Sequence, residues 1–101
     1  MIKVLIKFEE KAFESLEVSG HADTAPCGHD LVCAAVSGIL TGCTNAIKDE
    51  KNFRLISRDG YYKLEALGPL SSHDEGVIDS IIVGLQTIAS EYGKFIQIKN
   101  L

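Results

Sequence analysis

Two long stretches with apolar residues at three- and four-residue steps constrain the fold of this chain most. The apolar positions recur with that spacing in residues 31–49 and again in residues 72–92: Val32, Val36, Leu40, Cys43 and Ile47 in the first, and Val77, Ile78, Ile81, Leu85, Ile88 and Tyr92 in the second. An α-helix turns once every 3.6 residues, so this spacing places each set on one side of a helix. Both stretches are therefore predicted to be amphipathic helices that need a surface to cover.

Shorter segments around these helices have the composition and alternation of strands with one buried face. There are five of them: residues 2–8, 13–20, 53–58, 61–67 and 95–99. The first two are predicted to form an antiparallel hairpin across a tight connection. The next two flank Asp59-Gly60, a dipeptide typical of a type I′ turn between paired strands. Together these strands supply the surface that the helices need.

The predicted order is β-β-α-β-β-α-β, an α+β fold with two helices packed on a mostly antiparallel sheet. A length of 101 residues suits one domain that spans residues 1–101. Lys3 and Lys7 interrupt the apolar start, which is unlike a secretory signal, and no apolar run approaches the ~20 residues of a membrane span. We expect a cytoplasmic protein without membrane contact.

Net charge and cysteine count narrow the function classes further. The formal net charge is −4, whereas a dedicated nucleic-acid binder carries a basic stripe, so no direct contact with nucleic acid is expected. The three cysteines, Cys27, Cys33 and Cys43, are an odd number, which argues against a disulfide scaffold. Cys43 lies on an apolar helical stripe and is interpreted as a core residue.

Cys33 is the first candidate for chemistry. If Asp30 is the N-cap of the first helix, Cys33 is its third residue, where backbone N–H groups lack partners within the helix. The helix dipole and these N–H groups would favour a thiolate and would stabilise an oxyanion on a substrate carbonyl. A small buried core cysteine fits the same position, and the position alone favours neither interpretation.

His21 and Ser37 bear on that choice. His21 follows the second predicted strand, and the loop after it would fold the imidazole over the start of the helix, as the base of a Cys33 nucleophile. Ser37 lies one turn after Cys33 on the same helical flank, within reach of the sulfur or a substrate. The alternative for His21 is a solvated loop histidine, and Asp30 acts first as a helix cap and only secondarily on the imidazole.

The same segment also permits a metal or redox interpretation. His21, Cys27, His29 and Cys33 are four zinc-competent side chains, but they lack the closely spaced cysteine pair of structural zinc sites. Cys27 and Cys33 are also candidates for a peroxide-sensing thiol pair. A zinc or thiol redox module is therefore an alternative to nucleophilic catalysis.

Two short motifs carry a specific resemblance. "GHA" at residues 20–22 and "GHDLVCAAVS" at residues 28–37 resemble the bacterial ribosomal-processing cysteine protease family Prp (YsxB-like). That family has G-H-A, a variable loop, and then G-x-D-x-V-C-x-x-V-S, and each fixed position is present here. The resemblance extends over essentially the whole chain.

The resemblance implies a homodimeric cytoplasmic endopeptidase that trims a short N-terminal extension from a large-subunit ribosomal protein, number twenty-seven, during ribosome assembly. It assigns Cys33 as the nucleophile and His21 as its partner, with Asp30 and Ser37 in support and Gly28 as a loop hinge. It implies no metal and no cofactor, and it leaves Cys27 and His29 at variable positions. The alternatives that remain are a non-catalytic ribosome-associated dimer and the zinc or redox module.

Overall fold

The computed structural model describes residues 1–20 and 29–101, with the backbone alone for residues 29 and 30. The elements follow the predicted order, with one turn of 3-10 helix (Glu50–Asn52) before the third strand. Their bounds are β1 (Ile2–Glu9), β2 (Ala12–Ser19), α1 (His29–Thr44), β3 (Phe53–Arg58), β4 (Tyr61–Ala66), α2 (Ser72–Glu91) and β5 (Ile96–Asn100). The α+β class and the mostly antiparallel sheet are thereby confirmed.

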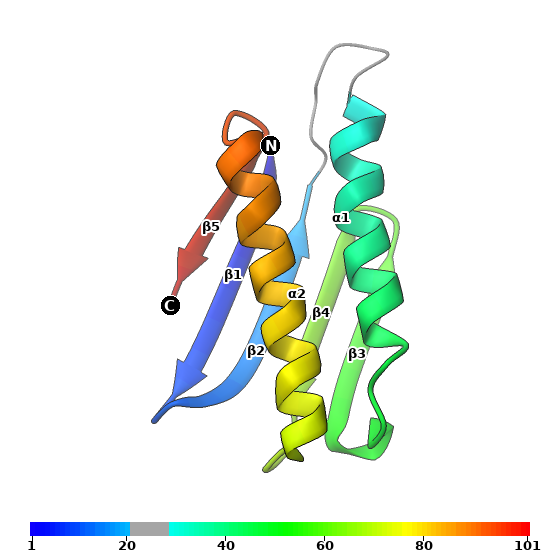
Figure 1. Ribbon diagram of the computed structural model, residues 1–101, viewed down its shortest axis with the longest axis vertical. Coiled ribbons are helices and arrows are strands. Elements are labelled where there is room, and N and C mark those ends of the chain that lie inside the picture. The colour runs from blue at the N-terminus through cyan, green and yellow to red at the C-terminus, as the bar shows by residue number, and fades with distance from the viewer. Residues whose placement is uncertain (21–28) are drawn as a thin grey trace.

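The five strands form one sheet in the order β3-β4-β2-β1-β5 (Figure 1). Antiparallel pairing joins β1 to β2, β2 to β4 and β3 to β4, whereas β5 runs parallel to β1. The parallel pair follows from the α2 connection. α2 carries the chain back to the end of the sheet at which β4 begins, so β5 runs in the same direction as β4 and therefore parallel to its neighbour β1. β3 and β5 are consequently the two edge strands.

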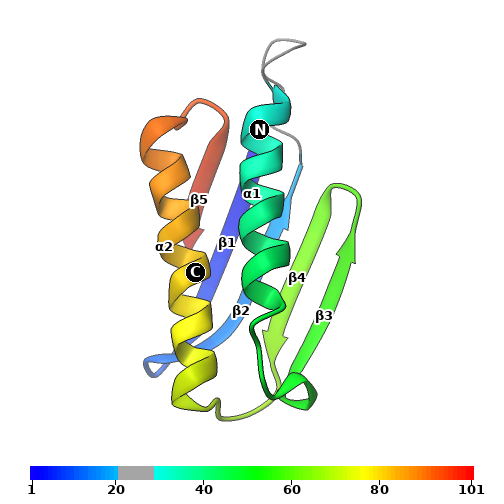
Figure 2. The ribbon, with the colours of Figure 1, turned by 45° about the vertical axis from the view of Figure 1, so that its right-hand side comes forward.

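Both helices cover the same face of the sheet (Figures 1 and 2). Each helix links two strands that point the same way, α1 between β2 and β3 and α2 between β4 and β5. The two connections cross the sheet in opposite directions and start from oppositely directed strands. A common right-handed crossover therefore places both helices on one side.

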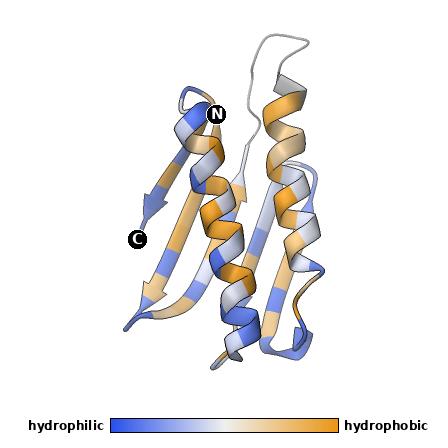
Figure 3. Cartoon of the chain, viewed as in Figure 1, coloured by the Kyte–Doolittle hydropathy of each residue, from blue (hydrophilic) through white to orange (hydrophobic). Residues whose placement is uncertain are grey.

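The core lies between the sheet and the helix layer. Alternate residues of β1 point into it, so Ile2, Val4 and Ile6 are buried while Lys3 and Lys7 are exposed on the far face. In Figure 3, blue polar bands interrupt the orange apolar bands along β1. The alternation that predicts a half-buried strand is thus realised as one covered and one open sheet face.

α1 ends at Thr44, earlier than the predicted end near residue 49. After Thr44, the N–H groups of Ala46 (2.9 Å) and Ile47 (3.1 Å) donate to carbonyls only three residues back. The chain then meets a fully buried carboxylate on α2, that of Asp74 (0% exposed). Its two oxygens accept hydrogen bonds from the backbone N–H groups of Lys48 (2.9 Å) and Asp49 (3.1 Å). Because these N–H groups bond to Asp74, they do not continue the helical hydrogen-bond pattern.

The start of α2 agrees with the prediction, whereas its end does not. Ser71 is the N-cap, and its hydroxyl accepts a hydrogen bond from the Asp74 N–H at 3.1 Å. Tyr92, predicted to belong to the apolar stripe, is instead the C-cap and is 46% exposed. The buried stripe of α2 ends at Ile88, and Tyr92 lies past the last helical residue, Glu91, with non-helical backbone angles (φ −125°, ψ 42°).

The type I′ conformation occurs at a different hairpin from the predicted one. Asp59-Gly60 does join β3 to β4, but only Gly60 has a positive φ (74°), and a type I′ turn needs two. The Gly60 carbonyl instead accepts a hydrogen bond from the Gly20 N–H at 3.0 Å, a tertiary contact that orients this turn. Positive φ values occur together at Glu10 (49°) and Lys11 (68°), between β1 and β2.

Neither described helix combines the length and the apolarity that crossing a bilayer requires.

The Asp74 contacts generate a prediction about acid stability. The hydrogen bond from Lys48 N–H is the largest cause of a lowered pKa for the Asp74 carboxyl, and the bond from Asp49 N–H adds to it. The unfolded chain has the ordinary value of about 3.9. The stabilisation by Asp74 is therefore full above about pH 4 and is lost as the pH falls through the lowered folded-state pKa.

We expect Asp74→Asn to lower the free energy of unfolding near neutral pH by about 1–3 kcal/mol, because an amide NH₂ replaces one acceptor. Urea unfolding of both proteins across the acid range should show this difference narrowing below about pH 3. Asp79→Asn, which changes an exposed acid on the same helix, is the control and should leave stability nearly unchanged. A difference independent of pH would contradict the ionised role of Asp74.

Candidate active site

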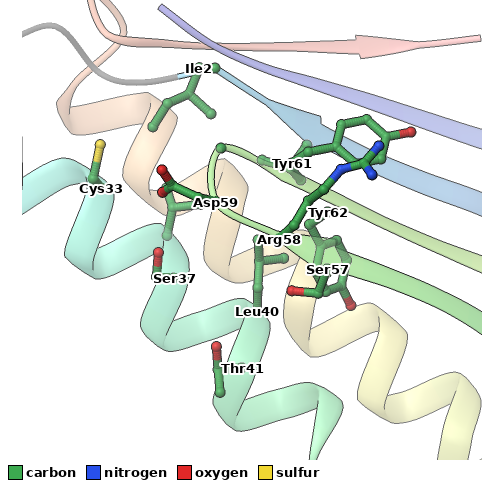
Figure 4. A pocket seen from close by; sticks show the side chains of 14 residues that line it. Ile2, Cys33, Ser37, Leu40, Thr41, Ser57, Arg58, Asp59, Tyr61 and Tyr62 are labelled. Atoms are coloured by element: carbon green, nitrogen blue, oxygen red, sulfur yellow. The ribbon is translucent and has the colours of Figure 1, made fainter.

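An open cleft lies between α1 and the turn that joins β3 to β4 (Figure 4). Its volume is about 170 Å³, below the ~300 Å³ at which pockets begin to enclose drug-sized ligands. Its floor is apolar, and its two walls carry polar side chains. The floor consists of Ile2, Val18, Val36, Leu40 and Tyr62. The cleft therefore suits one side chain of a longer ligand better than an entire cofactor.

One wall of the cleft is a flank of α1. Cys33, Ser37 and Thr41 line it at intervals of four residues, so they stand in a row along the helix (Figure 4). Each of them directly follows a buried core residue, and one step along a helix is a rotation of 100°. Packing of the core residues thereby decides which way this row faces. Cys33 is half-buried and also packs against the core.

The other wall is the β3–β4 turn, which is held against the end of β2. The Gly20 N–H donates to the Gly60 carbonyl, so the turn is bound to the last residue before the segment that contains His21. Gly20 itself has φ +93°, and a Cβ there would collide with the main-chain oxygen of Met1. A glycine is required at residue 20 for both reasons.

Two tyrosines near the cleft are fixed as neutral hydroxyl groups. The Tyr61 hydroxyl donates to Oε2 of Glu17 at 2.8 Å, and this hydrogen bond is the main reason that its pKa is raised. Burial is the main reason for the raised pKa of Tyr62, whose hydroxyl pairs with Oγ1 of Thr44 at 2.7 Å. Neither phenol is therefore suited to act as a base at neutral pH.

The structure brings two of the sequence-predicted residues together and leaves the others untested. Cys33 and Ser37 share the α1 wall of the cleft. Asp30 lies in α1, but its side chain is not described. The proposed base and hinge and the other loop cysteine lie outside the described residues: His21, Gly28 and Cys27.

The expected capping role of Asp30 is wrong. α1 begins at His29, so Asp30 is its second residue and Cys33 its fifth. The N–H groups without helical partners belong to the first turn, and the dipole effect is strongest there. Cys33 therefore lies just beyond that turn. Its position in the cleft is a firmer indication of chemistry than its place in the helix.

The structure adds two polar residues to the cleft that the sequence motifs do not single out. Asp59 lies on the wall opposite α1, and Thr41 extends the row of Cys33 and Ser37 on α1 itself. The four-residue spacing from Cys33 through Ser37 to Thr41 contained the signal for Thr41. No local pattern indicates Asp59, because it reaches the cleft through sheet pairing. Within residues 1–20 and 29–101, no three His, Cys, Asp or Glu side chains are grouped as metal ligands.

Comparison with known proteins finds relatives that align with most of this chain. The family model described as cysteine protease Prp matches residues 1–97. The ribosomal processing cysteine protease Prp of Bacillus subtilis is 35% identical, with 91% of this chain and 90% of that protein aligned. The Prp of Staphylococcus aureus is 29% identical over 80% of each chain.

Solved structures extend the similarity to the fold. A crystal structure of the essential ribosomal processing protease Prp from S. aureus, in complex with a covalently linked product peptide, has a TM-score of 0.87 at 29% identity, and both chains are covered fully. The S. aureus structure with a substrate peptide has a TM-score of 0.77 at 27% identity, again with full coverage of both chains.

The open position of Cys33 predicts selective modification. Both thiols are half-buried against the core, but Cys33 lines the cleft and Cys43 does not. We expect iodoacetamide at mildly acidic pH to modify Cys33 before Cys43 and Cys27, as mapped by mass spectrometry of tryptic peptides. The Cys43→Ala protein should retain this adduct, and Cys33→Ala should lose it. Faster labelling of either other cysteine would refute the nucleophile assignment.

Proposed function

This chain belongs to the Prp family of cysteine proteases, and from that premise we propose that it removes a short N-terminal extension from a ribosomal protein precursor. The observation that carries the proposal is the position of Cys33 on the wall of an open, side-chain-sized cleft, in a chain whose family match covers residues 1–97. The relatives' own names, ribosomal processing cysteine protease, support the substrate class. The proposed substrate is large-subunit ribosomal protein number twenty-seven, cleaved in support of ribosome assembly.

The proposed reaction is acyl transfer to Cys33. His21 takes the thiol proton, the Sγ atom attacks the scissile carbonyl carbon, and the C–N bond then breaks as His21 gives that proton to the leaving amine. The same imidazole then takes a proton from water, which hydrolyses the thioester, and returns the proton to the sulfur to regenerate the thiol. Ser37 lies one helical turn from Cys33 on the same wall, which suits a hydrogen bond to the sulfur or the substrate. Asp30 has a supporting role within the same motif.

The shape of the cleft supports a peptide as the substrate. It is open, its floor is apolar, and its walls offer the hydroxyl groups of Ser37, Thr41 and Ser57. An extended peptide presents one side chain at a time and leaves its backbone available for hydrogen bonds, which matches a narrow apolar floor between polar walls. A folded domain would not enter a cleft of this volume.

Cleavage of the extended precursor tests the proposal directly. We expect the wild-type protein to shorten the precursor at one position, and Cys33→Ala and His21→Ala to slow this by about a thousandfold or more. Cys43→Ala is the matched control and should cleave at nearly the wild-type rate. Mass spectrometry of the products reports the position. Normal cleavage by Cys33→Ala would refute the dyad, and binding of the precursor without cleavage by the wild type would favour a non-catalytic role.

We further propose that the enzyme works in the cytoplasm as a homodimer. Large apolar side chains extend outward from the helix layer, among them Leu31 (70% exposed) on α1 and Val83 (58% exposed) on α2. Burial of such side chains against a second copy would remove them from water.

Sedimentation equilibrium tests whether the protein is a homodimer. The wild type should have twice the chain mass of 11.0 kDa, and Leu31→Lys and Val83→Lys should each shift it toward the monomer. Leu67→Lys changes an equally apolar exposed residue outside the helices and should leave the mass unchanged. A wild-type mass of one chain would refute the homodimer.

A further inference from the structure

The cleft contains one carboxylate that the proposed chemistry does not use. Asp59 is the only acidic residue among the cleft-lining residues that the structure describes. It lies in the β3–β4 turn, and its side chain extends from that turn toward the α1 wall and its Cys33 end (Figure 4). A negative charge is therefore placed at the side of the cleft where the scissile bond would lie.

This carboxylate has no protein partner among residues 1–20 and 31–101 or the backbone of residues 29 and 30. The described hydrogen bonds and ion pairs of the chain do not include it. The adjacent cation does not neutralise it, because the guanidinium of Arg58 lies over the Tyr61 ring, 5.3 Å from its centroid. Figure 4 shows the Arg58 and Asp59 side chains extending in opposite directions from the turn.

The backbone that carries Asp59 is held in place. The next residue, Gly60, has a positive φ of 74°, and its carbonyl accepts the hydrogen bond from Gly20 at 3.0 Å. Tyr61 is anchored to Glu17 at 2.8 Å. A charged group on a fixed turn loses little conformational freedom when a ligand arrives, so its interaction with that ligand is not offset by ordering.

We propose that Asp59 is a specificity residue that selects peptide substrates with a lysine or arginine near the scissile bond. This inference rests on the proposed protease function and adds the charge of the substrate to it. The cationic side chain would extend along the cleft and donate hydrogen bonds to the Asp59 carboxylate. Because Asp59 is exposed, the preference should be at most about fivefold in kcat/KM and should weaken at high salt.

The test uses three series of peptides that span the cleavage junction of the precursor, with Lys, Gln or Glu placed in turn at each position on either side. The wild type should prefer Lys over Gln at one position and disfavour Glu there. Asp59→Asn should lose the preference for Lys, so that it cleaves the Lys and Gln series at nearly equal rates. Asp59→Lys should prefer Glu at the same position. Asp79→Asn removes an exposed acid on α2, outside the cleft, and should behave as the wild type.

The outcomes separate this inference from the function on which it rests. Cleavage of the Gln series by the wild type without any preference for Lys would overturn the role of Asp59 and leave the protease function standing. An equal loss of activity by Asp59→Asn on all three series would also overturn it, in favour of a general positioning role. No cleavage of any series would instead refute the protease function itself.

Discussion

Packing of α1 against the sheet is the interaction on which the rest of the site depends. Val32, Val36 and Leu40 enter the core, and the residue after each of them therefore faces the cleft. A rotation of the helix by one residue would move Cys33 and Ser37 by 100° and would remove both from the cleft. The orientation of this cleft wall is in this sense a consequence of hydrophobic burial. The same burial leaves the outer flank of α1, with Leu31, open to a partner.

Polar contacts at both ends of the helix layer complete this arrangement. At the far end from Cys33, the buried Asp74 carboxylate binds the backbone of Lys48 and Asp49 and so holds the segment that follows α1 against α2. At the near end, Gly20 holds the β3–β4 turn through Gly60. The two walls of the cleft are thus attached to the same sheet in different ways, α1 by core packing and the β3–β4 turn by the hydrogen bond between Gly20 and Gly60. Neither wall can shift without breaking a backbone hydrogen bond or exposing apolar surface.

A cysteine protease needs a nucleophile that a peptide can reach, a proton carrier and a means of selecting a sequence. Our proposals assign the first role to Cys33 and the third to Asp59. Relatives with the same fold have been solved with substrate and covalently linked product peptides. In our proposal, the apolar floor binds an apolar side chain of the peptide and the Asp59 carboxylate binds a cationic one. Two weak preferences of this kind together select a substrate more sharply than either alone.

The sequence by itself determined the local elements and the catalytic candidates. The spacing of Val32, Val36 and Leu40 was sufficient to predict α1, and the motifs around Cys33 were sufficient to predict the family. Turn geometry, the end of α1 and the acidic wall of the cleft were decided by the tertiary structure alone. Asp74 meets residues 48 and 49 across the helix layer, and Asp59 reaches the cleft because β4 pairs with β2. Such contacts join residues far apart in the chain, and local periodicity reports only which side of an element is buried, not which element will lie opposite it.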